Sequence, residues 1–583
     1  FIGGSGTNSN VVIGNFIGTD VTGTAALGNG DRGVTIIGGA QSNTIGGTTA
    51  GERNIISGNG NSGVEIDGAG TDNNKVSGNY IGTDVNGTAD LGNGVSGVII
   101  WNGPQGNTIG GTTAGERNII SGNDQDGVGM GLGTNNNTVS GNYIGTDVTG
   151  TVDLGNTIHG VVINFGAQGN TIGGTTAGER NIISGNDQNG IGILDSGTNS
   201  NVVIGNFIGT DVTGTAALGN LDRGVSIGGG AQSNTIGGTT SGERNVVSGN
   251  DRSGVLIIQP GTDNNVVIGN YIGIDVTGTA ALGNGWEGVI IWDGPQGNTI
   301  GGTTSGERNI ISGNSSTGVR IAQPGTDNNV VIGNYIGIVV TGTAALGNTH
   351  GGVDIYGGAQ SNTIGGTTAG ERNIISGNSN HGVLMWGSGT NGNVVSGNYI
   401  GTDVNGTADL GNASCGVSIW DGPQSNTIGG TRNTIAFNGG NGVEVNGEET
   451  DFNKISQNSM HDNVGMGIDL VNGGNDEIAP PNITSNSLAD DILTVSGDSA
   501  GADATVEIFK ADASTQEGEV FLGSLTADAD GNFIGALDVT GKRLFVGAPL
   551  AATTTHTNNN TSELVSLRFR RSPSVLHRST SAQ

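Results

Sequence analysis

The sequence predicts an all-β chain, in which a right-handed parallel β-helix of three sheets and about 15 coils is followed by a small β-sandwich. Three observations lead to this fold class. A 64-residue unit repeats along most of the chain, each unit contains short stretches of alternating aliphatic residues, and Gly or Asn separates these stretches. A solenoid is the architecture in which such units bury their aliphatic side chains against their neighbours.

Two short strings mark the repeat. One string, Ile-Gly-Thr-Asp in most copies, recurs at steps of 63 or 64 residues and ends at Asp20, Asp84, Asp147, Asp211, Asp275, Val339 and Asp403. The other string, Gly-Glu-Arg-Asn, recurs with the same steps. Each unit contains two coils, because a Gly followed by alternating aliphatics recurs at steps of 30 and then 33 or 34 residues. The steps shorten to 26 and 25 at Gly442 and Gly467, where two loop insertions are absent, so the coil itself has about 25 residues.

Each coil contains three stretches with the period of a β-strand. In the coil that starts at Gly33 they are 34–36, 43–45 and 54–56, with β-branched residues in alternation. Gly and Asn between the stretches supply positive φ angles and side-chain turns at the corners. Asn recurs at matching corners, where we expect amide ladders that join successive coils. With a rise of about 4.8 Å per coil, the stacked coils form a rod roughly 70 Å long.

Composition limits the range of functions. Asp and Glu number 51 against 20 Lys and Arg, a net charge of −31 that disfavours binding to nucleic acid phosphates. The single cysteine, Cys415, permits no intrachain disulfide. No run of about 18 apolar residues occurs, so we expect no membrane insertion. The chain starts at Phe1, inside a repeat, and we expect the numbered sequence to be a mature or cut fragment.

Three phrases carry a family resemblance. Asn-Thr-Ile-Gly-Gly (43–47), Asn-Ile-Ile-Ser-Gly-Asn (54–59) and Gly-Asn-Tyr-Ile-Gly-Thr-Asp (78–84) resemble the secreted right-handed parallel β-helix repeat proteins of the pectate-lyase-like superfamily. The resemblance covers about residues 1–475. It implies an extracellular or cell-surface protein, but the superfamily includes lyases, glycoside hydrolases, phage tailspikes, adhesins and structural proteins, and fold does not choose among them.

The C-terminal part differs in pattern from the repeats. We assign residues 476–485 to a linker that is rich in turn residues. Residues 486–566 contain alternating stretches at sandwich-like spacing and resemble the small Ig-like domains that follow such β-helices in bacterial surface proteins. Residues 567–583 form a basic tail with Arg568, Arg570, Arg571 and Arg578, which we expect to be disordered.

Aromatic residues gather at one outward position of the first stretch in each coil. This position, four residues after the starting Gly, holds four of the five Trp residues, and its aromatic members are Trp101, Trp292, Tyr356, Trp386 and Trp420. A row of aromatic rings on a flat sheet suits stacking against sugar rings or contact with a protein. We treat these five residues as candidate ligand-binding residues; the alternative is that a neighbouring loop covers them.

Charged residues give weaker candidates. The outward position two residues after the starting Gly holds Arg320, Asp354, Glu444 and Asp469, which are the candidate catalytic residues for glycoside hydrolysis or lyase chemistry. Surface charge is the alternative interpretation of all four. Glu52 and Arg53 occur as a pair six times along the chain, which predicts a repeated loop salt bridge instead of a single active site.

The repeated aspartates form a further candidate row, whose members are Asp20, Asp84, Asp147, Asp211, Asp275 and Asp403. Carboxylates in a row could bind calcium, the one cofactor that we consider. Turn formation is the favoured interpretation, because the repeat lacks the calcium-binding pattern of β-rolls.

These observations leave two functional hypotheses. The favoured one is a secreted or cell-surface structural or adhesive rod, which binds polysaccharide or a cell-surface partner along one sheet and assembles head to tail into filaments. The alternative is a polysaccharide hydrolase or lyase with its site on the first sheet. Release of products from a polysaccharide would distinguish the enzyme from the rod.

Overall fold

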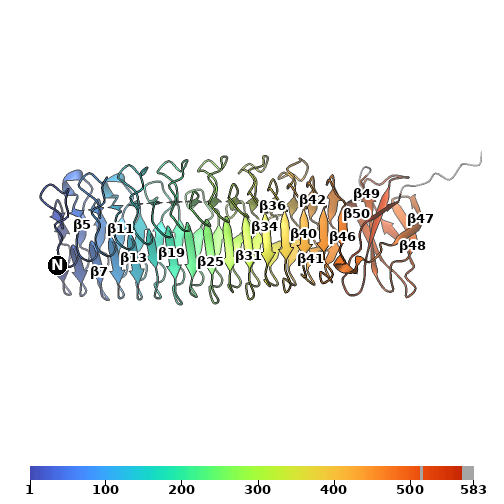
Figure 1. Cartoon of the computed structure of the whole chain (residues 1–583), viewed down its shortest axis with the longest axis horizontal. Coiled ribbons are helices and arrows are strands. Elements are labelled where there is room, and N and C mark those ends of the chain that lie inside the picture. The colour runs from blue at the N-terminus through green and yellow to red at the C-terminus, as the bar shows by residue number, and fades with distance from the viewer. Residues whose placement is uncertain (513–516, 568–583) are drawn as a thin grey trace, which may run out of the picture.

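The computed structural model describes residues 1–512 and 517–567 and shows a long solenoid that ends in a compact antiparallel domain (Figure 1). Three parallel sheets of 16, 15 and 15 strands run along the rod, which confirms the predicted all-β solenoid of about 15 coils. Arg568, Arg570, Arg571 and Arg578 of the predicted basic tail lie outside the described residues.

The first sheet contains the first strand of each coil. Its strands are β1 (Ile2–Gly3), β4 (Val34–Ile37), β7 (Val64–Asp67), β10 (Val98–Trp101), β13 (Val128–Gly131), β16 (Val161–Ile163), β19 (Ile191–Leu194), β22 (Val225–Gly228), β25 (Val255–Ile258), β28 (Val289–Trp292), β31 (Val319–Ala322), β34 (Val353–Tyr356), β37 (Val383–Trp386), β40 (Val417–Trp420), β43 (Val443–Asn446) and β46 (Ile468–Val471). Most of these strands have four residues, the longest of the solenoid, and such a strand has two outward positions.

The second and third sheets contain shorter strands. The second consists of β2 (Val11–Val12), β5 (Thr44–Gly46), β8 (Lys75–Ser77), β11 (Thr108–Gly110), β14 (Thr138–Ser140), β17 (Thr171–Gly173), β20 (Val202–Ile204), β23 (Thr235–Gly237), β26 (Val266–Ile268), β29 (Thr299–Gly301), β32 (Val330–Ile332), β35 (Thr363–Gly365), β38 (Val394–Ser396), β41 (Thr427–Gly429) and β44 (Lys454–Ser456). The third consists of β3 (Phe16–Ile17), β6 (Ile55–Ile56), β9 (Tyr80–Ile81), β12 (Ile119–Ile120), β15 (Tyr143–Ile144), β18 (Ile182–Ile183), β21 (Phe207–Ile208), β24 (Val246–Val247), β27 (Tyr271–Ile272), β30 (Ile310–Ile311), β33 (Tyr335–Ile336), β36 (Ile374–Ile375), β39 (Tyr399–Ile400), β42 (Thr434–Ala436) and β45 (Ser459–His461).

Helical structure is limited to three short 3₁₀ turns, η1 (Ala50–Glu52), η2 (Ala114–Glu116) and η3 (Gly474–Glu477), within the described residues. None of the described residues belongs to a helix that is long and apolar enough to span a membrane.

Aliphatic side chains fill the interior of the solenoid. Ile36, Ile66 and Ile100 lie one above another in register and are fully buried, and the same stack continues through the following coils. Each coil therefore buries its apolar surface against the coils on both sides, which is how a chain with few aromatic residues obtains a continuous core.

Amide ladders join the coils at the corners, as the sequence predicts. In one ladder the Nδ2 of Asn43 donates to Oδ1 of Asn74 (2.9 Å), and Asn74 donates to Asn107 (3.1 Å). The Oδ1 of each Asn also accepts the backbone N–H of the preceding ladder residue, for example Asn43 to Asn74 (2.9 Å). These amides are buried, so the ladder satisfies polar groups that water cannot reach.

The repeated Glu and Arg do not form the predicted loop salt bridge. The carboxylate of Glu52 accepts the backbone N–H groups of Thr48 (2.9 Å) and Thr49 (3.0 Å), and so closes its own loop. The guanidinium of Arg53 instead lies 4.0 Å from the centroid of the Tyr80 ring. Six repeat arginines stack in this way, at 4.0–4.2 Å, on the aromatic residue of the next coil. The prediction was wrong because adjacent residues point in different directions, and the coil above offers a ring to the arginine.

The C-terminal domain contains two antiparallel sheets. One has the strand order β47 (Asn482–Ala489), β48 (Ile492–Asp498) and β51 (Phe533–Asp538). The other has the order β50 (Gly518–Thr526), β49 (Thr505–Ala511), β52 (Leu550–Thr555) and β53 (Val565–Leu567). The first of these strands begins at Asn482, within the segment assigned to the linker.

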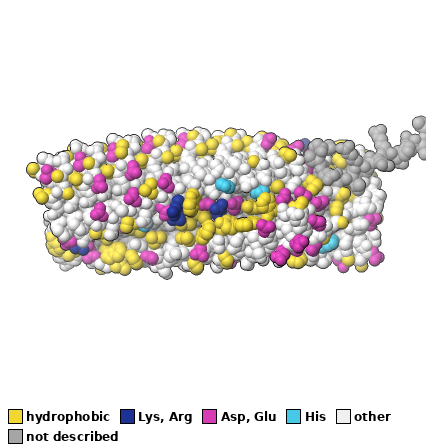
Figure 2. All heavy atoms as spheres, viewed as in Figure 1, with side chains coloured by type: hydrophobic (Ala, Val, Ile, Leu, Met, Phe, Trp, Pro, Cys, Tyr) yellow, Lys and Arg dark blue, Asp and Glu magenta, His cyan; other side chains and the backbone are white. Residues whose placement is uncertain are grey.

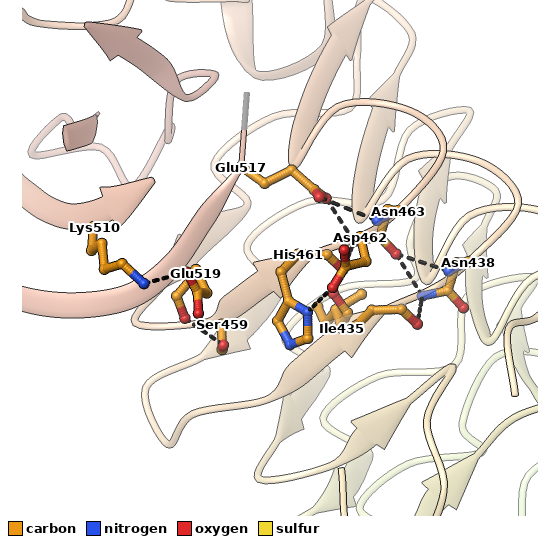
Figure 3. Close-up of polar contacts among 10 residues, drawn as sticks. Ile435, Asn438, Ser459, His461, Asp462, Asn463, Lys510, Glu517 and Glu519 are labelled. Carbon is orange, nitrogen blue, oxygen red and sulfur yellow. Dashed lines mark hydrogen bonds and ion pairs between the residues drawn. The ribbon is translucent and has the colours of Figure 1, made fainter. Parts of the chain in front are cut away.

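This domain covers the last coil of the solenoid. Glu507 accepts hydrogen bonds from the Ser456 hydroxyl (2.6 Å) and the Gln457 N–H (2.9 Å). Glu517 accepts the backbone N–H (3.1 Å) and the side-chain Nδ2 (2.7 Å) of Asn463, which ends one amide ladder (Figure 3). These buried carboxylates take the place of the next coil, so the domain caps the C-terminal end of the rod.

Candidate functional site

The outward residues of the first sheet stand in two columns along the rod. Parallel pairing aligns Arg320 with Asp354, and Glu444 with Asp469. In the second column Tyr356 is paired with Trp386, and Trp386 with Trp420, so these three aromatic residues occupy consecutive coils. The structure therefore places the candidate residues in the expected columns.

Three of the aromatic residues form a connected row. The ring centroids of Trp292 and Tyr356 lie 6.3 Å apart, and those of Tyr356 and Trp386 lie 5.9 Å apart. The Trp386 side chain is 45% exposed, and its Nε1 donates to Asp421 (2.8 Å), which fixes the indole orientation. An exposed aromatic ring held in one orientation is a suitable platform for an apolar face of a ligand.

The other two candidates lie apart from this row. Trp420 packs edge-on against His381, with centroids 4.8 Å apart, and donates to Glu444 (2.8 Å). Trp101 is six coils before Trp292 and packs edge-on against Phe165 (5.6 Å).

A groove of about 560 Å³ lies over β25, β28, β31 and β34. Its floor includes the outward side chains Leu256, Ile290, Trp292 and Tyr356, and the loops before these strands contribute Trp286, Glu287, Ser315, Ser316 and His350. We call it the first-sheet groove. Figure 2 shows hydrophobic side chains gathered along this face, with basic, acidic and histidine side chains among them. Apolar walls with a few polar groups are typical of a ligand site.

A buried ion cluster forms one end of the groove. Arg320 forms ion pairs with Glu287 and with Asp354 (3.3 Å). Asp354 also accepts the Thr317 hydroxyl (2.6 Å), and Glu287 accepts the Ser253 hydroxyl (3.0 Å). Burial lowers the pKa of Arg320, but the two carboxylates outweigh this effect and the net shift is upward. The cluster thus fixes a permanent cation between two acids.

The remaining two catalytic candidates form a separate cluster. Asn441 donates to both Glu444 (3.1 Å) and Asp469 (2.8 Å), and it thereby bridges them. Burial raises the pKa of Asp469, and the charge of Glu444 adds to this effect. Three coils separate Asp354 from Glu444, about 14 Å along the rod, so the four candidates do not form one constellation.

Sequence reasoning missed Glu287 and Trp286, although both line the groove. Glu287 directly precedes the starting Gly of its coil, and the same position holds Thr317, His381 and Asn441 in later coils. A comparison of this position between coils would have shown a third variable column. In the structure, residues of this column make polar contacts with the outward residues of the first sheet.

One pair in this third column gives a pH-dependent prediction. Burial raises the pKa of Asp126 to about 6, while the Oδ1 atom of Asp126 accepts the backbone N–H of His159 (3.1 Å). The folded state favours the protonated carboxyl, so stability from this group is present below about pH 4 and is lost as pH rises through about 6. Asp126→Asn keeps the acceptor, and we expect a gain in unfolding free energy of about 3 kcal/mol at pH 7 and none near pH 4. Denaturation at both pH values measures this; a gain of equal size at both would contradict it.

The aspartate row serves the turns of the longer loops. Oδ1 of Asp84 accepts the backbone N–H groups of Thr88 (2.8 Å) and Ala89 (3.1 Å), and Asp403 makes the same bonds to Thr407 (2.9 Å) and Ala408 (3.1 Å). Asp20, Asp147, Asp211 and Asp275 accept equivalent N–H groups in their own loops. Within residues 1–512 and 517–567, no three His, Cys, Asp or Glu side chains lie together as a metal site.

Fold and site together define a class of protein, a parallel β-solenoid with an aromatic groove on one outer sheet. No protein-family model and no curated protein matches the chain. Among solved structures, the chain is similar to the tailspike protein of E. coli bacteriophage HK620. A mutant of that protein in complex with a hexasaccharide has 11% identity and a TM-score of 0.33, over 90% of this chain and 85% of that one. The same tailspike with a pentasaccharide has 11% identity and a TM-score of 0.32, over 90% and 79%. Similarity at this level carries no functional argument, so the function is argued from the groove itself.

Proposed function

We propose that this protein is a secreted or cell-surface rod that binds polysaccharide in the first-sheet groove. The observation that carries the proposal is a connected row of aromatic rings: Trp292 and Tyr356 line this groove, and Trp386 continues the row on the next coil, just outside the groove lining. Sugar rings present apolar C–H faces, which stack on aromatic rings, and hydroxyl edges, which form hydrogen bonds.

Polar groups at the groove suit those hydroxyl edges. Ser315, Ser316 and His350 line it and offer hydroxyl and imidazole groups, while Arg320 adds a positive charge held by Glu287 and Asp354. Trp292 and Tyr356 lie two coils apart on an open sheet, and Trp386 lies on the coil after Tyr356, so one extended ligand is able to contact several of these rings. This arrangement favours a chain of sugars over a single small molecule.

Assembly into filaments has less support than ligand binding. The C-terminal domain already satisfies the last coil through Glu507 and Glu517. Head-to-tail growth by addition of a coil at this end would require that domain to move. Filament assembly is therefore not part of the proposed function.

Catalysis is the second candidate function. Glu444 and Asp469 are two carboxyl groups bridged by Asn441, and the raised pKa of Asp469 is a property expected of a general acid. This pair lies beyond Trp420, outside the first-sheet groove. Release of oligosaccharides from a polysaccharide, abolished by Asp469→Asn, would establish this function.

The binding proposal is tested with Trp386→Ala on a panel of immobilised polysaccharides. We expect retention by the wild type on at least one polysaccharide and at least tenfold weaker affinity for the variant, equivalent to about 1.4 kcal/mol. Trp101→Ala is the matched control, because Trp101 occupies the same column far from the groove. No retention of the wild type, or equal losses in both variants, would refute the proposal.

A further inference from the structure

A second cavity lies where the stacked loops of the solenoid come to an end. It has a volume of about 400 Å³ and is lined by residues that include Thr367, Arg372, Tyr399, Gly406, Arg432 and His461. We call it the terminal pocket. It is separate from the first-sheet groove, with which it shares no lining residue.

The pocket lies at the end of the stack of long loops, after the last long loop of the sequence. In earlier coils a valine of each long loop donates its N–H to a glycine carbonyl of the loop before it, as Val340 does to Gly278 and Val404 to Gly342 (both 3.0 Å). Gly406 is the equivalent glycine of the last long loop, and the sequence has no further long loop to supply the equivalent valine. Among the described residues, its carbonyl accepts no such bond.

The shorter loops end in the same region. Gly370 of the last complete loop sits directly on the Thr303 carbonyl of the loop before it, and the same contact joins Gly306 to Thr239. The next coil reads Thr431-Arg432-Asn433, which lacks four residues of the repeated loop. No repeat loop therefore stacks on Thr367 within the described residues, and Tyr399 remains partly exposed while Tyr335 is 5% exposed.

Arg432 loses its usual partner through the same change. It corresponds to the repeat arginines that stack on an aromatic ring in the next coil. In the next coil, the position equivalent to Tyr399 is Ser459, whose hydroxyl donates to the Glu519 carbonyl (2.6 Å; Figure 3). In the part of the chain that the structure describes, Arg432 forms no ion pair, hydrogen bond or ring contact, and it lines the pocket with an exposed side chain.

Two further nitrogen-bearing groups line this pocket. Arg372 uses Nε to donate to the Gly397 carbonyl (3.2 Å) and stacks on Tyr399 (4.0 Å), and its terminal nitrogens have no hydrogen bond within the described residues. His461 directs Nδ1 toward Asp462 (2.8 Å; Figure 3), which leaves Nε2 available. The carboxylate of Glu371, in the adjoining loop, already accepts hydrogen bonds from the backbone N–H groups of Thr367 (2.9 Å) and Thr368 (2.8 Å).

We propose that the terminal pocket binds a small oxyanion group, namely a carboxylate of an acidic sugar or a phosphate. Two guanidinium groups provide the charge and the planar donor geometry that such a group prefers. Threonine hydroxyls and the Asn405 amide around the pocket suit the neutral hydroxyls of the same ligand. On a chain of net charge −31, this cavity brings together two arginines that form no ion pair within the described residues.

The test is calorimetric titration of the full chain with galacturonate, with inorganic phosphate and with neutral galactose. We expect binding of at least one anion, at least tenfold weakening in Arg432→Gln, and a decrease in affinity with added salt. Arg308→Gln is the matched control, because Arg308 is an equivalent repeat arginine that stacks on Tyr335 under intact loops.

Each outcome decides the proposal. Binding of galacturonate alone identifies an acidic sugar as the ligand class, and binding of phosphate alone identifies a phosphate group. Absence of binding by the wild type to both anions overturns the proposal, as does equal weakening in Arg308→Gln. Binding of galactose as strong as that of galacturonate would show that the anion is not recognised.

Discussion

Replacement of Arg320 by alanine is expected to lower the free energy of unfolding of the surrounding coils by about 3–5 kcal/mol. The variant leaves Glu287 and Asp354 without their cation, and the Glu287 side chain is only 4% exposed. The two uncompensated carboxylates, on the coils before and after that of Arg320, repel each other in a place that water cannot fully reach. The midpoint of guanidinium denaturation measures the loss.

Two further variants separate the charge effect from loss of packing. Arg320→Ala combined with Glu287→Gln and Asp354→Asn removes the repulsion, and we expect it to recover at least half of the lost stability. Arg252→Ala removes an exposed ion pair with Asp222, and we expect a loss below about 1 kcal/mol. If Arg320→Ala were as mild as Arg252→Ala, the ion cluster would have no structural role.

The double variant Glu507→Ala with Glu517→Ala is expected to open the C-terminal cap. It removes the acceptors of the Ser456 hydroxyl, the Gln457 N–H and two donors of Asn463. Buried donors without acceptors cost about 1–3 kcal/mol each, so we expect a loss of about 4 kcal/mol at this interface. Hydrogen exchange measures it, as faster exchange confined to the last coils while the central coils keep their protection.

The matched control is Glu507→Gln, which keeps an acceptor oxygen and removes the charge. Burial raises the pKa of Glu507, so the folded state disfavours its ionised form, and that penalty appears as pH rises through the folded pKa. We therefore expect Glu507→Gln to retain the slow exchange of the last coils at pH 7. Fast exchange in this variant, or slow exchange in the double alanine variant, would contradict the role assigned to these carboxylates.

Periodicity made the solenoid predictable. Steps of 30 and 33 or 34 residues, with a Gly before each Val-x-Ile, specify where each first strand starts, and the register of Tyr356, Trp386 and Trp420 follows from them. The buried amide ladders were predictable for the same reason, because an Asn that recurs at one corner meets its own copy in the next coil.

Contacts between different columns could not be read from the repeat. Glu287 and Arg320 are 33 residues apart and stand in different columns, so no periodic argument pairs them. The predicted salt bridge between Glu52 and Arg53 was wrong for a similar reason, because Arg53 stacks on Tyr80, which lies in the next coil. The side chains of these two consecutive residues point to different partners, Glu52 to its own loop and Arg53 to the next coil.

The sequence by itself determined the three-sheet solenoid, its register and its aromatic column, because stacking identical coils turns a one-dimensional period into fixed contacts. Only the tertiary structure decided where the groove lies, which carboxylates pair with Arg320, how the last coil is capped and where the terminal pocket forms. These features occur where the repeat is broken or where loops and columns meet, and there the side-chain directions and the loss of a neighbour determine the contacts.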